Sequence, residues 1–198
     1  MLGVSLACLK CLAASENKEL YEYVSGKSVS LPVPMINIIN GGKHAVNNID
    51  IQEFMIVPVV KIMHERIRAG AEVFHELKKL LVKNNFSVGV GDEGGFAPNL
   101  ENNAMTLEFI VEAIKKAGYK PGEDIYIALD VAASEIYNKE TKTYNIDGRN
   151  LTSKELMDYY QELLKRYPIL SIEDPFFEDD FESLQEFTAL VGDKIMLV

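Results

Sequence analysis

Five side chains, each close to an apolar segment of the sequence, could do acid–base or metal chemistry. They are His44, Glu53, Glu93, Asp130 and Glu173. A carboxyl group can donate or accept a proton or bind a divalent cation, and an imidazole can exchange a proton near neutral pH. Each residue by itself also has an ordinary interpretation as a helix cap, a surface acid or a loop histidine. The interpretation therefore depends on the segments that carry the five residues.

The first of these segments, residues 40–55, connects two apolar runs and has the sequence Asn-Gly-Gly-Lys-His-Ala-Val-Asn-Asn-Ile-Asp-Ile-Gln-Glu-Phe-Met. Its two consecutive glycines can adopt backbone angles that other residues avoid, which suits a mobile or sharply turned loop. The loop carries His44 and leads into a strand that holds Glu53. This combination predicts a lid or the rim of a ligand site. The alternative is a polar hairpin with an incidental histidine.

The other three carboxylates follow short apolar runs that alternate with helical patterns, which predicts βα units and a parallel sheet. Glu93 follows the run 87–90, whereas Asp130 and Glu173 each close an apolar run of their own. Catalytic groups gather at the carboxyl ends of the strands in a parallel α/β barrel. Acids gathered at one rim repel one another unless a cation or a shared proton relieves them. Mg²⁺ suits such a site because it prefers oxygen ligands and keeps waters that a substrate can replace.

The elements that must position these side chains follow from the apolar pattern. Residues 1 to about 24 predict a helix and a further helical turn, and residues 25–30 have the composition of a linker. Two antiparallel strands are expected at roughly 33–39 and 52–58. The segment 139–148 predicts a hairpin or a loop after the strand that Asp130 closes.

Helix signals complete this pattern. A helix is expected across residues 67–81, with one apolar face formed by Ile67, Gly70, Ala71, Phe74, Leu77 and Leu81. Thr152 and Glu155 match the capping-box pattern, and Asp179 and Glu182 can cap the following helix. The last apolar run, residues 194–198, predicts a strand. Because a strand that ended there would be left uncovered, we interpret the chain as an interior piece of a longer protein.

Composition narrows the classes of function. The chain of 198 residues has 20 Lys and Arg against 30 Asp and Glu, for a formal net charge of −10. An acidic chain without a basic cluster is a poor candidate for binding nucleic acid or anionic lipid. No stretch approaches the ~20 apolar residues of a membrane span, so no transmembrane segment is expected.

The two cysteines, Cys8 and Cys11, form a lone Cys-x-x-Cys pattern. A redox interpretation would require a βαβ context, whereas these residues follow helical spacing together with Leu2, Val4 and Leu12. We therefore expect reduced cysteines on a helix of a cytoplasmic protein.

Four segments, taken together, resemble the enolase family. They are residues 40–55, Val-Gly-Val-Gly-Asp-Glu-Gly-Gly-Phe-Ala-Pro-Asn at 88–99, Ile-Tyr-Ile-Ala-Leu-Asp at 125–130, and Ile-Leu-Ser-Ile-Glu-Asp-Pro-Phe at 169–176. The resemblance covers essentially the whole chain. It implies an α/β fold in which residues 31–198 form an incomplete enolase-type TIM-like (β/α) barrel. Residues 1–30 would be the tail of the family's N-terminal α+β capping domain, with the linker.

The resemblance also implies an activity and a role for each of the five residues. Enolases are Mg²⁺-dependent lyases of glycolysis that reversibly dehydrate 2-phosphoglycerate to phosphoenolpyruvate. By resemblance, Asp130 and Glu173 bind the metal, and Glu173 also belongs to the substrate site. Glu93 is the proton donor, Glu53 is its partner on the substrate, and His44 closes over the bound substrate.

Other parts of the family's site have no match within these residues. By resemblance, the catalytic lysine base, a third carboxylate ligand, the phosphate-binding group and the loop for a second Mg²⁺ lie outside the chain. Residues 1–198 alone are therefore expected to be inactive. The full-length protein is expected to be a cytoplasmic homodimer. Two alternatives remain: another lyase of the enolase superfamily, and a non-catalytic, surface-binding role.

Overall fold

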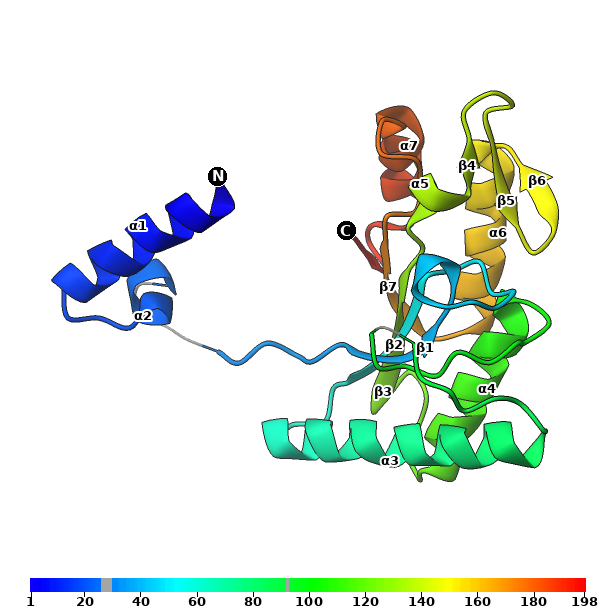
Figure 1. Cartoon of the computed structure of the whole chain (residues 1–198), viewed down its shortest axis with the longest axis horizontal. Coiled ribbons are helices and arrows are strands. Elements are labelled where there is room, and N and C mark those ends of the chain that lie inside the picture. The colour runs from blue at the N-terminus through cyan, green and yellow to red at the C-terminus, as the bar shows by residue number, and fades with distance from the viewer. Residues whose placement is uncertain (26–29, 92) are drawn as a thin grey trace. The chain divides into compact units, whose positions relative to one another are not determined.

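A computed structural model of the chain describes residues 1–25, 30–91 and 93–198. The chain divides into two compact units, Met1–Pro32 and Val33–Val198, both drawn in Figure 1. Residues 26–29, which make up most of the predicted linker, lie outside the described residues, as does residue 92.

The first unit is a pair of helices, α1 (Leu2–Ser15) and α2 (Leu20–Ser25), as the sequence predicts. Ala13 is the buried residue of α1, and α2 has none. Cys8 and Cys11 are free and exposed on α1, in agreement with the helical interpretation of their spacing.

The second unit is built on a sheet of five strands in the order β1-β2-β3-β7-β8. The strands are β1 (Ile36–Asn40), β2 (Glu53–Pro58), β3 (Ile125–Asp130), β7 (Ile169–Glu173) and β8 (Met196–Leu197). Strand β2 is antiparallel to both β1 and β3, whereas β3, β7 and β8 run parallel. Strands β1 and β8 are its edges in the described part of the chain, so the sheet is open there. The predicted α/β fold with an incomplete barrel is confirmed.

The predicted strand at residues 87–90 is wrong. This segment makes one isolated bridge, between Val90 and Phe96, and Val90 is 59% exposed. Phe96 instead pairs with β1, where its N–H donates to the carbonyl oxygen of Ile38 at 2.9 Å. Glycines weaken strands, and the segment from Gly89 to Gly95 contains four of them, so the chain folds back on itself before it reaches β1.

The two faces of the sheet differ in what covers them. Phe54, Ile127 and Leu129 belong to the large core shared with the helices, whereas Met55 and Ala128 form a small separate cluster. Side chains at alternate positions of a strand share a face, so the first residue of β2 and the last residue of β3 point toward the small cluster. In a barrel this face is the interior.

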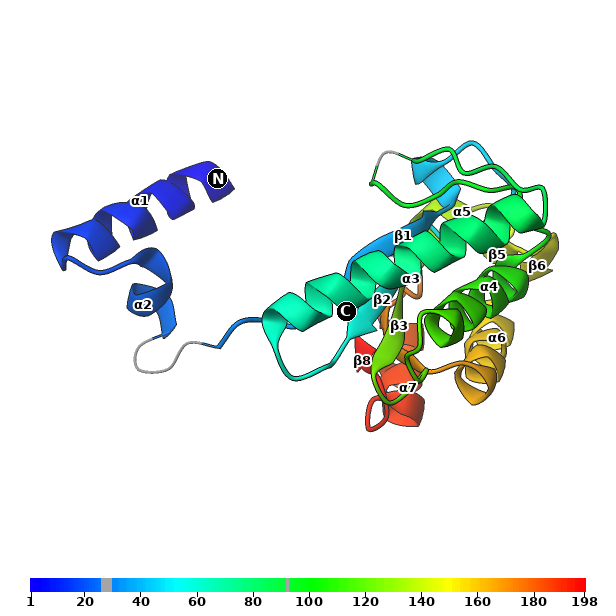
Figure 2. The same cartoon turned by 90° about the horizontal axis from the view of Figure 1, so that it is seen from below.

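Four long helices accompany the sheet: α3 (Met63–Lys83), α4 (Asn103–Lys116), α6 (Ser153–Arg166) and α7 (Phe181–Val191). Figure 2 shows α3 and α4 running side by side, consistent with their mutual contacts. Among the described residues, no helix has both the length and the apolarity needed to cross a lipid bilayer.

Helix α3 has the predicted period, and Gly70, Leu77 and Leu81 of the predicted face are buried. Ile67 and Ala71 are exposed, and the buried residues are Ala69, Gly70, Val73, Leu77, Leu80 and Leu81. A Cβ atom on Gly70 would lie 2.3 Å from Cδ1 of Ile36, so α3 approaches β1 at the one position that has no side chain. Gly70 therefore lies where the buried face of the helix meets β1.

Between β3 and α6 lie a short helix, α5 (Ala133–Ile136), and a small sheet of β4 (Tyr137–Asn138), β5 (Thr143–Ile146) and β6 (Arg149–Leu151). The hairpin alternative for 139–148 is therefore the observed one. Its turn is Asp147–Gly148, with φ of 47° and 68°, the conformation that favours Asp-Gly in a two-residue hairpin.

Of the two predicted helix caps, one is confirmed and the other is shifted by one residue. The capping box of Thr152 and Glu155 is present in full at the start of α6. At α7 the cap is Asp180, whose Oδ1 accepts from the N–H of Ser183 at 3.2 Å, so the assignment to Asp179 is wrong by one residue. The chain reaches the helix only after Asp180 because Asp179 still belongs to the preceding turn.

Candidate functional site

Three of the five predicted side chains lie in one row across the sheet. Glu53 on β2 is paired in register with Asp130 on β3, and Asp130 with Glu173 on β7. Adjacent strands are about 4.8 Å apart, so the carboxylates are neighbours along this edge. Because β2 runs antiparallel to β3, its first residue lies beside the last residues of β3 and β7.

His44 reaches this row from the loop between β1 and β2, at the end of the short 3₁₀ helix η1 (Gly42–His44). Its Nδ1 atom lies 3.1 Å from Oε1 of Glu53, and both side chains are mostly buried. The contact is close but is not an aligned hydrogen bond, since Nδ1 has no hydrogen-bond partner in the described part of the chain. An imidazole and a carboxylate this close attract each other when the imidazole is charged.

The glycines of this loop are required by its close approach to the chain that follows it. The N–H of Gly41 donates to the carbonyl oxygen of Gln52 at 2.9 Å, and that of Gly42 to Ile49 at 2.8 Å. A Cβ atom on Gly41 would lie 2.4 Å from the carbonyl oxygen of Ile51, which leaves no room for another residue. These two backbone hydrogen bonds therefore close the loop at its base. They restrain the segment that carries His44.

Glu93 is not at the end of a strand, contrary to the interpretation of residues 87–90, yet it still reaches the site. It is exposed in a tight turn, where the N–H of Gly91 donates to the carbonyl oxygen of Gly95 at 2.8 Å. One ligand atom each from His44, Glu53 and Glu93 lie within 4.8 Å of one another. The turn that carries Glu93 presses on β1: a Cβ atom on Gly95 would be 2.8 Å from backbone atoms of that strand.

The acids of the row hold their protons more tightly than usual. Burial raises the pKa of Glu53, and the charge of Asp130 raises it further, while His44 opposes the shift. The charges of Glu93 and Glu173 add to the rise at Glu53. A site that raises the pKa of an acid in this way favours either a shared proton or a bound cation.

Burial likewise raises the pKa of Asp130 and of Glu173. The negative charge of Asp130 adds to the rise at Glu173, and Asp174 adds to it at both residues. Two hydrogen bonds partly offset the rise at Asp130. Its Oδ2 accepts from Nε2 of Gln52 at 3.2 Å, and its Oδ1 accepts from the N–H of Ala132 at 3.0 Å.

The donor set of Asp130 and Glu173 fits a hard divalent cation such as Mg²⁺. Both residues offer carboxylate oxygens, they are register partners, and their mutual repulsion is the kind that a cation relieves. The tighter group of His44, Glu53 and Glu93 includes a nitrogen donor and is less suited to Mg²⁺. The chemistry of the donors therefore favours the pair at the strand ends as the metal site.

Gln52 is a residue of the site that the sequence interpretation did not single out. It precedes Glu53, and its side chain donates a hydrogen bond to Asp130. It therefore links the start of β2 to the end of β3. A polar residue directly before an acid at the start of a strand was the available signal, but alternation alone places it on the opposite face.

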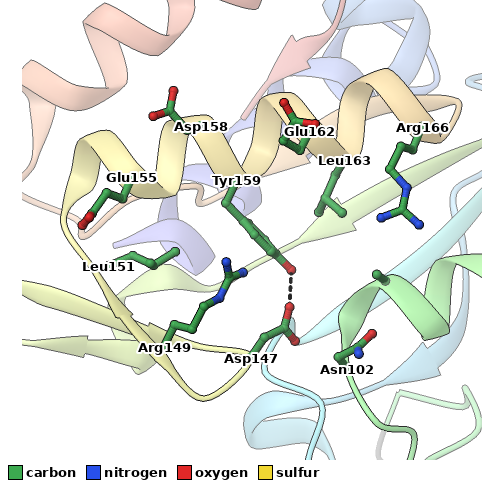
Figure 3. Close-up of a pocket in the computed structure, with 11 residues that line it drawn as sticks. Asn102, Asp147, Arg149, Leu151, Glu155, Asp158, Tyr159, Glu162, Leu163 and Arg166 are labelled. Atoms are coloured by element: carbon green, nitrogen blue, oxygen red, sulfur yellow. Dashed lines mark hydrogen bonds between the residues drawn. The ribbon is translucent and has the colours of Figure 1, made fainter.

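A cavity of about 660 Å³ lies elsewhere, between the β5–β6 hairpin, α4 and α6 (Figure 3). None of the five predicted side chains lines it. The row of acids at the sheet edge, and not this cavity, is therefore the candidate functional site.

A comparison with known protein families agrees with this arrangement. The family model described as the enolase C-terminal TIM barrel domain matches residues 28–198. The match contains all five predicted site residues and the whole sheet.

Proposed function

The chain belongs to the enolase family, and on that premise we propose that it carries part of the active site of a phosphopyruvate hydratase. This enzyme interconverts 2-phosphoglycerate and phosphoenolpyruvate by loss or addition of water. The observation that carries the proposal is the row of Glu53, Asp130 and Glu173 at one sheet edge, with His44 and Glu93 brought to the same place.

The leaving group decides what the acids must do. Hydroxide leaves poorly unless it is protonated, so the reaction needs a general acid with a raised pKa. Glu53 and Glu93 have oxygens within 4.8 Å of each other, so the charge of Glu93 adds to burial and to the charge of Asp130 in raising the pKa of Glu53. We assign the proton transfer to Glu93, because its exposed position lets it meet the substrate, and assign to Glu53 the role of its partner.

Asp130 and Glu173 would hold Mg²⁺. Bound there, the cation would stabilise the negative charge that develops on the substrate carboxylate when the neighbouring proton is removed. Gln52 and the N–H of Ala132 orient the Asp130 carboxylate for this task. His44 stands beside Glu53 at the end of a pinned loop, from which it can cover the bound substrate.

The assay of the proposal follows formation of phosphoenolpyruvate from 2-phosphoglycerate by the intact protein that contains these residues. We expect turnover that requires Mg²⁺ and is lost in Asp130→Ala. A panel of other 2-hydroxy and branched carboxylates tests the alternative of a different lyase of the superfamily. Turnover of a panel compound without turnover of 2-phosphoglycerate would refute the substrate, and no turnover of any of them would refute the enzymatic role. The homodimer and the cytoplasmic location are further proposals that rest on the family resemblance.

A further inference from the structure

Asn103 is a buried polar residue with a fixed set of partners. It is the first residue of α4 and has no exposed surface. Its Oδ1 accepts from the backbone N–H of Ile51 at 3.2 Å, and its Nδ2 donates to Oδ1 of Asp147 at 2.9 Å. A backbone N–H must meet an oxygen and a carboxylate must meet a donor, so these two partners fix the orientation of the amide. A buried amide is costly unless both of its ends are bonded, and here both are.

Asp147, the partner of Asn103, is itself a junction. It lies in the hairpin turn, where its Oδ1 also accepts from the backbone N–H of Asn103 at 3.0 Å. Its Oδ2 accepts from the hydroxyl of Tyr159 at 2.9 Å, a contact drawn in Figure 3. Its own N–H donates to Oδ2 of Asp50 at 2.7 Å. The start of α4, the hairpin and α6 are thus joined to the loop between β1 and β2.

The point at which Asn103 holds this loop is next to the reacting groups. Ile51 is buried and immediately precedes Gln52, which bonds Asp130, and Glu53, which contacts His44. On the other side, the ring closed by Gly41 and Gln52 fixes the loop to β1. Asn103 supplies the contact that fixes the same stretch of backbone from the side of α4.

We propose that Asn103 is a positioning residue for the site. Within the described residues it makes no hydrogen bond to any of the five proposed functional side chains, and it acts by holding the backbone of residues 50–53 so that Glu53 keeps its place beside His44 and Asp130. The inference deepens the proposed function, and its kinetic consequences rest on that function. The structural consequence, restraint of the backbone at Ile51, does not depend on the reaction.

The expected effect is larger on turnover than on binding. Misplacement of a reacting group by about 1 Å can cost ~10²-fold in rate, because the reaction needs its groups in line. We expect Asn103→Leu, which keeps the number and branching of the side-chain heavy atoms but removes both hydrogen bonds, to lower kcat by at least ~10-fold with a change in KM of less than ~3-fold. Hydrogen exchange of the Ile51 amide should become at least ~10-fold faster.

The test uses two further variants. Asn103→Asp keeps an acceptor for Ile51 but places a carboxylate against Asp147. Adding Asp147→Asn puts a donor opposite the new acid, but that donor replaces the oxygen that accepts from the backbone N–H of residue 103. We expect the single variant to lose turnover and the double variant to recover part of it, even if Asn103→Leu does not fold. The control is Asn102→Ala, which removes the N-cap contact to Met105 in the same helix and leaves Ile51 bonded. It should lower the melting temperature without changing kcat or the exchange of Ile51.

The readouts separate the inference from the proposed function. Exchange of the Ile51 amide that is unchanged in the Asn103 variants would overturn the positioning role, whatever the assay shows. Equal losses of kcat in Asn102→Ala and in the Asn103 variants would also overturn it, because the effect would then follow general stability of α4. If the wild-type protein showed no turnover of 2-phosphoglycerate, faster exchange in the Asn103 variants would still support the restraint, while the proposed function alone would fail.

Discussion

Glu53 and Asp130 face each other directly in the register of antiparallel strands β2 and β3. Like charges in directly opposed positions destabilise a sheet. The next strand, β7, places Glu173 in the same row, where a Lys or Arg side chain would have offset the charge. The fold therefore retains repulsion between three carboxylates at the edge of the sheet that carries this row. Such repulsion is typical of a site that binds a cation or shares a proton.

The first prediction concerns the metal. Asp130→Asn and Glu173→Gln should each weaken Mg²⁺ binding by at least ~10-fold in isothermal titration, because each removes an anionic ligand. In the absence of metal the same variants should melt about 2–4 °C higher, since each removes a repulsive charge worth roughly 1 kcal/mol. The control is Glu101→Gln, an exposed acid outside the row, which should change neither quantity. Unchanged Mg²⁺ affinity in both variants would refute the assignment.

A second prediction tests Glu93 as the general acid. Glu93→Gln should lower turnover by ~10²-fold or more, the usual scale of general acid catalysis. Exchange of the α-proton of 2-phosphoglycerate with solvent should be lost much less than dehydration, because proton removal precedes departure of hydroxide. The two rates are measured by deuterium incorporation and by phosphoenolpyruvate formation. Equal loss of both would mean that Glu93 only positions the substrate.

Packing of the Glu93 turn gives a third prediction. Gly95→Ala should destabilise the protein by about 1–3 kcal/mol, because the new Cβ would overlap the backbone of β1. Displacement of the turn should also reduce activity, since it carries Glu93. Gly89→Ala is the matched control in the same segment, because its nearest neighbour would be the Ser87 hydroxyl at 3.4 Å. Chemical denaturation of both variants measures the difference, and equal stabilities would contradict the packing argument.

A fourth prediction concerns stability at low pH. Burial by itself would raise the pKa of Asp180, but hydrogen bonds from Ser153, Ser183 and Tyr144 outweigh it and lower the pKa overall. A carboxyl group with a lowered folded-state pKa stabilises the fold above its unfolded pKa of about 3.9. That contribution is lost as the pH falls through the lower, folded-state pKa.

The variant Asp180→Asn should therefore be less stable than the wild type by about 1–2 kcal/mol near neutral pH, since bonds to a charged acceptor are the stronger ones. The difference should shrink as the pH falls below about 4. Denaturant titrations across this range measure it, with the exposed Asp193→Asn as control. A difference that stays constant with pH would show that the charge of Asp180 is not the cause.

Features carried by local pattern were predictable from the sequence. Asp130 and Glu173 close apolar runs, and parallel strands bring their carboxyl ends to one edge, so their proximity follows from the pattern. The capping box at Thr152 was likewise predicted from a local pattern and is present in the structure. The roles of these residues in catalysis stay predictions.

Features that depend on contacts between distant segments were not predictable. Val90 has the residue type of a strand, but the glycines around it and the pairing of Phe96 with β1 decide otherwise. On the predicted face of α3, the helical period does not show that Ile67 and Ala71 stay exposed. Asn103 had no local signal at all, because its partners lie 52 and 44 residues away in the sequence.

The reversed direction of β2 also has an evolutionary consequence. Because β2 is antiparallel to β1, the loop between these strands lies at the sheet edge that carries the row of acids. The register of Glu53 with Asp130 is set by the pairing of β2 with β3 and not by the length of that loop. Val46, at the loop tip, is fully exposed, so extra residues there would displace no packed side chain. Doubling a loop costs only about 0.6 kcal/mol in closure entropy. Insertions near Val46 could therefore move His44 while leaving the acids in place, so under the proposed function substrate preference could diverge at this loop while the row of acids is kept.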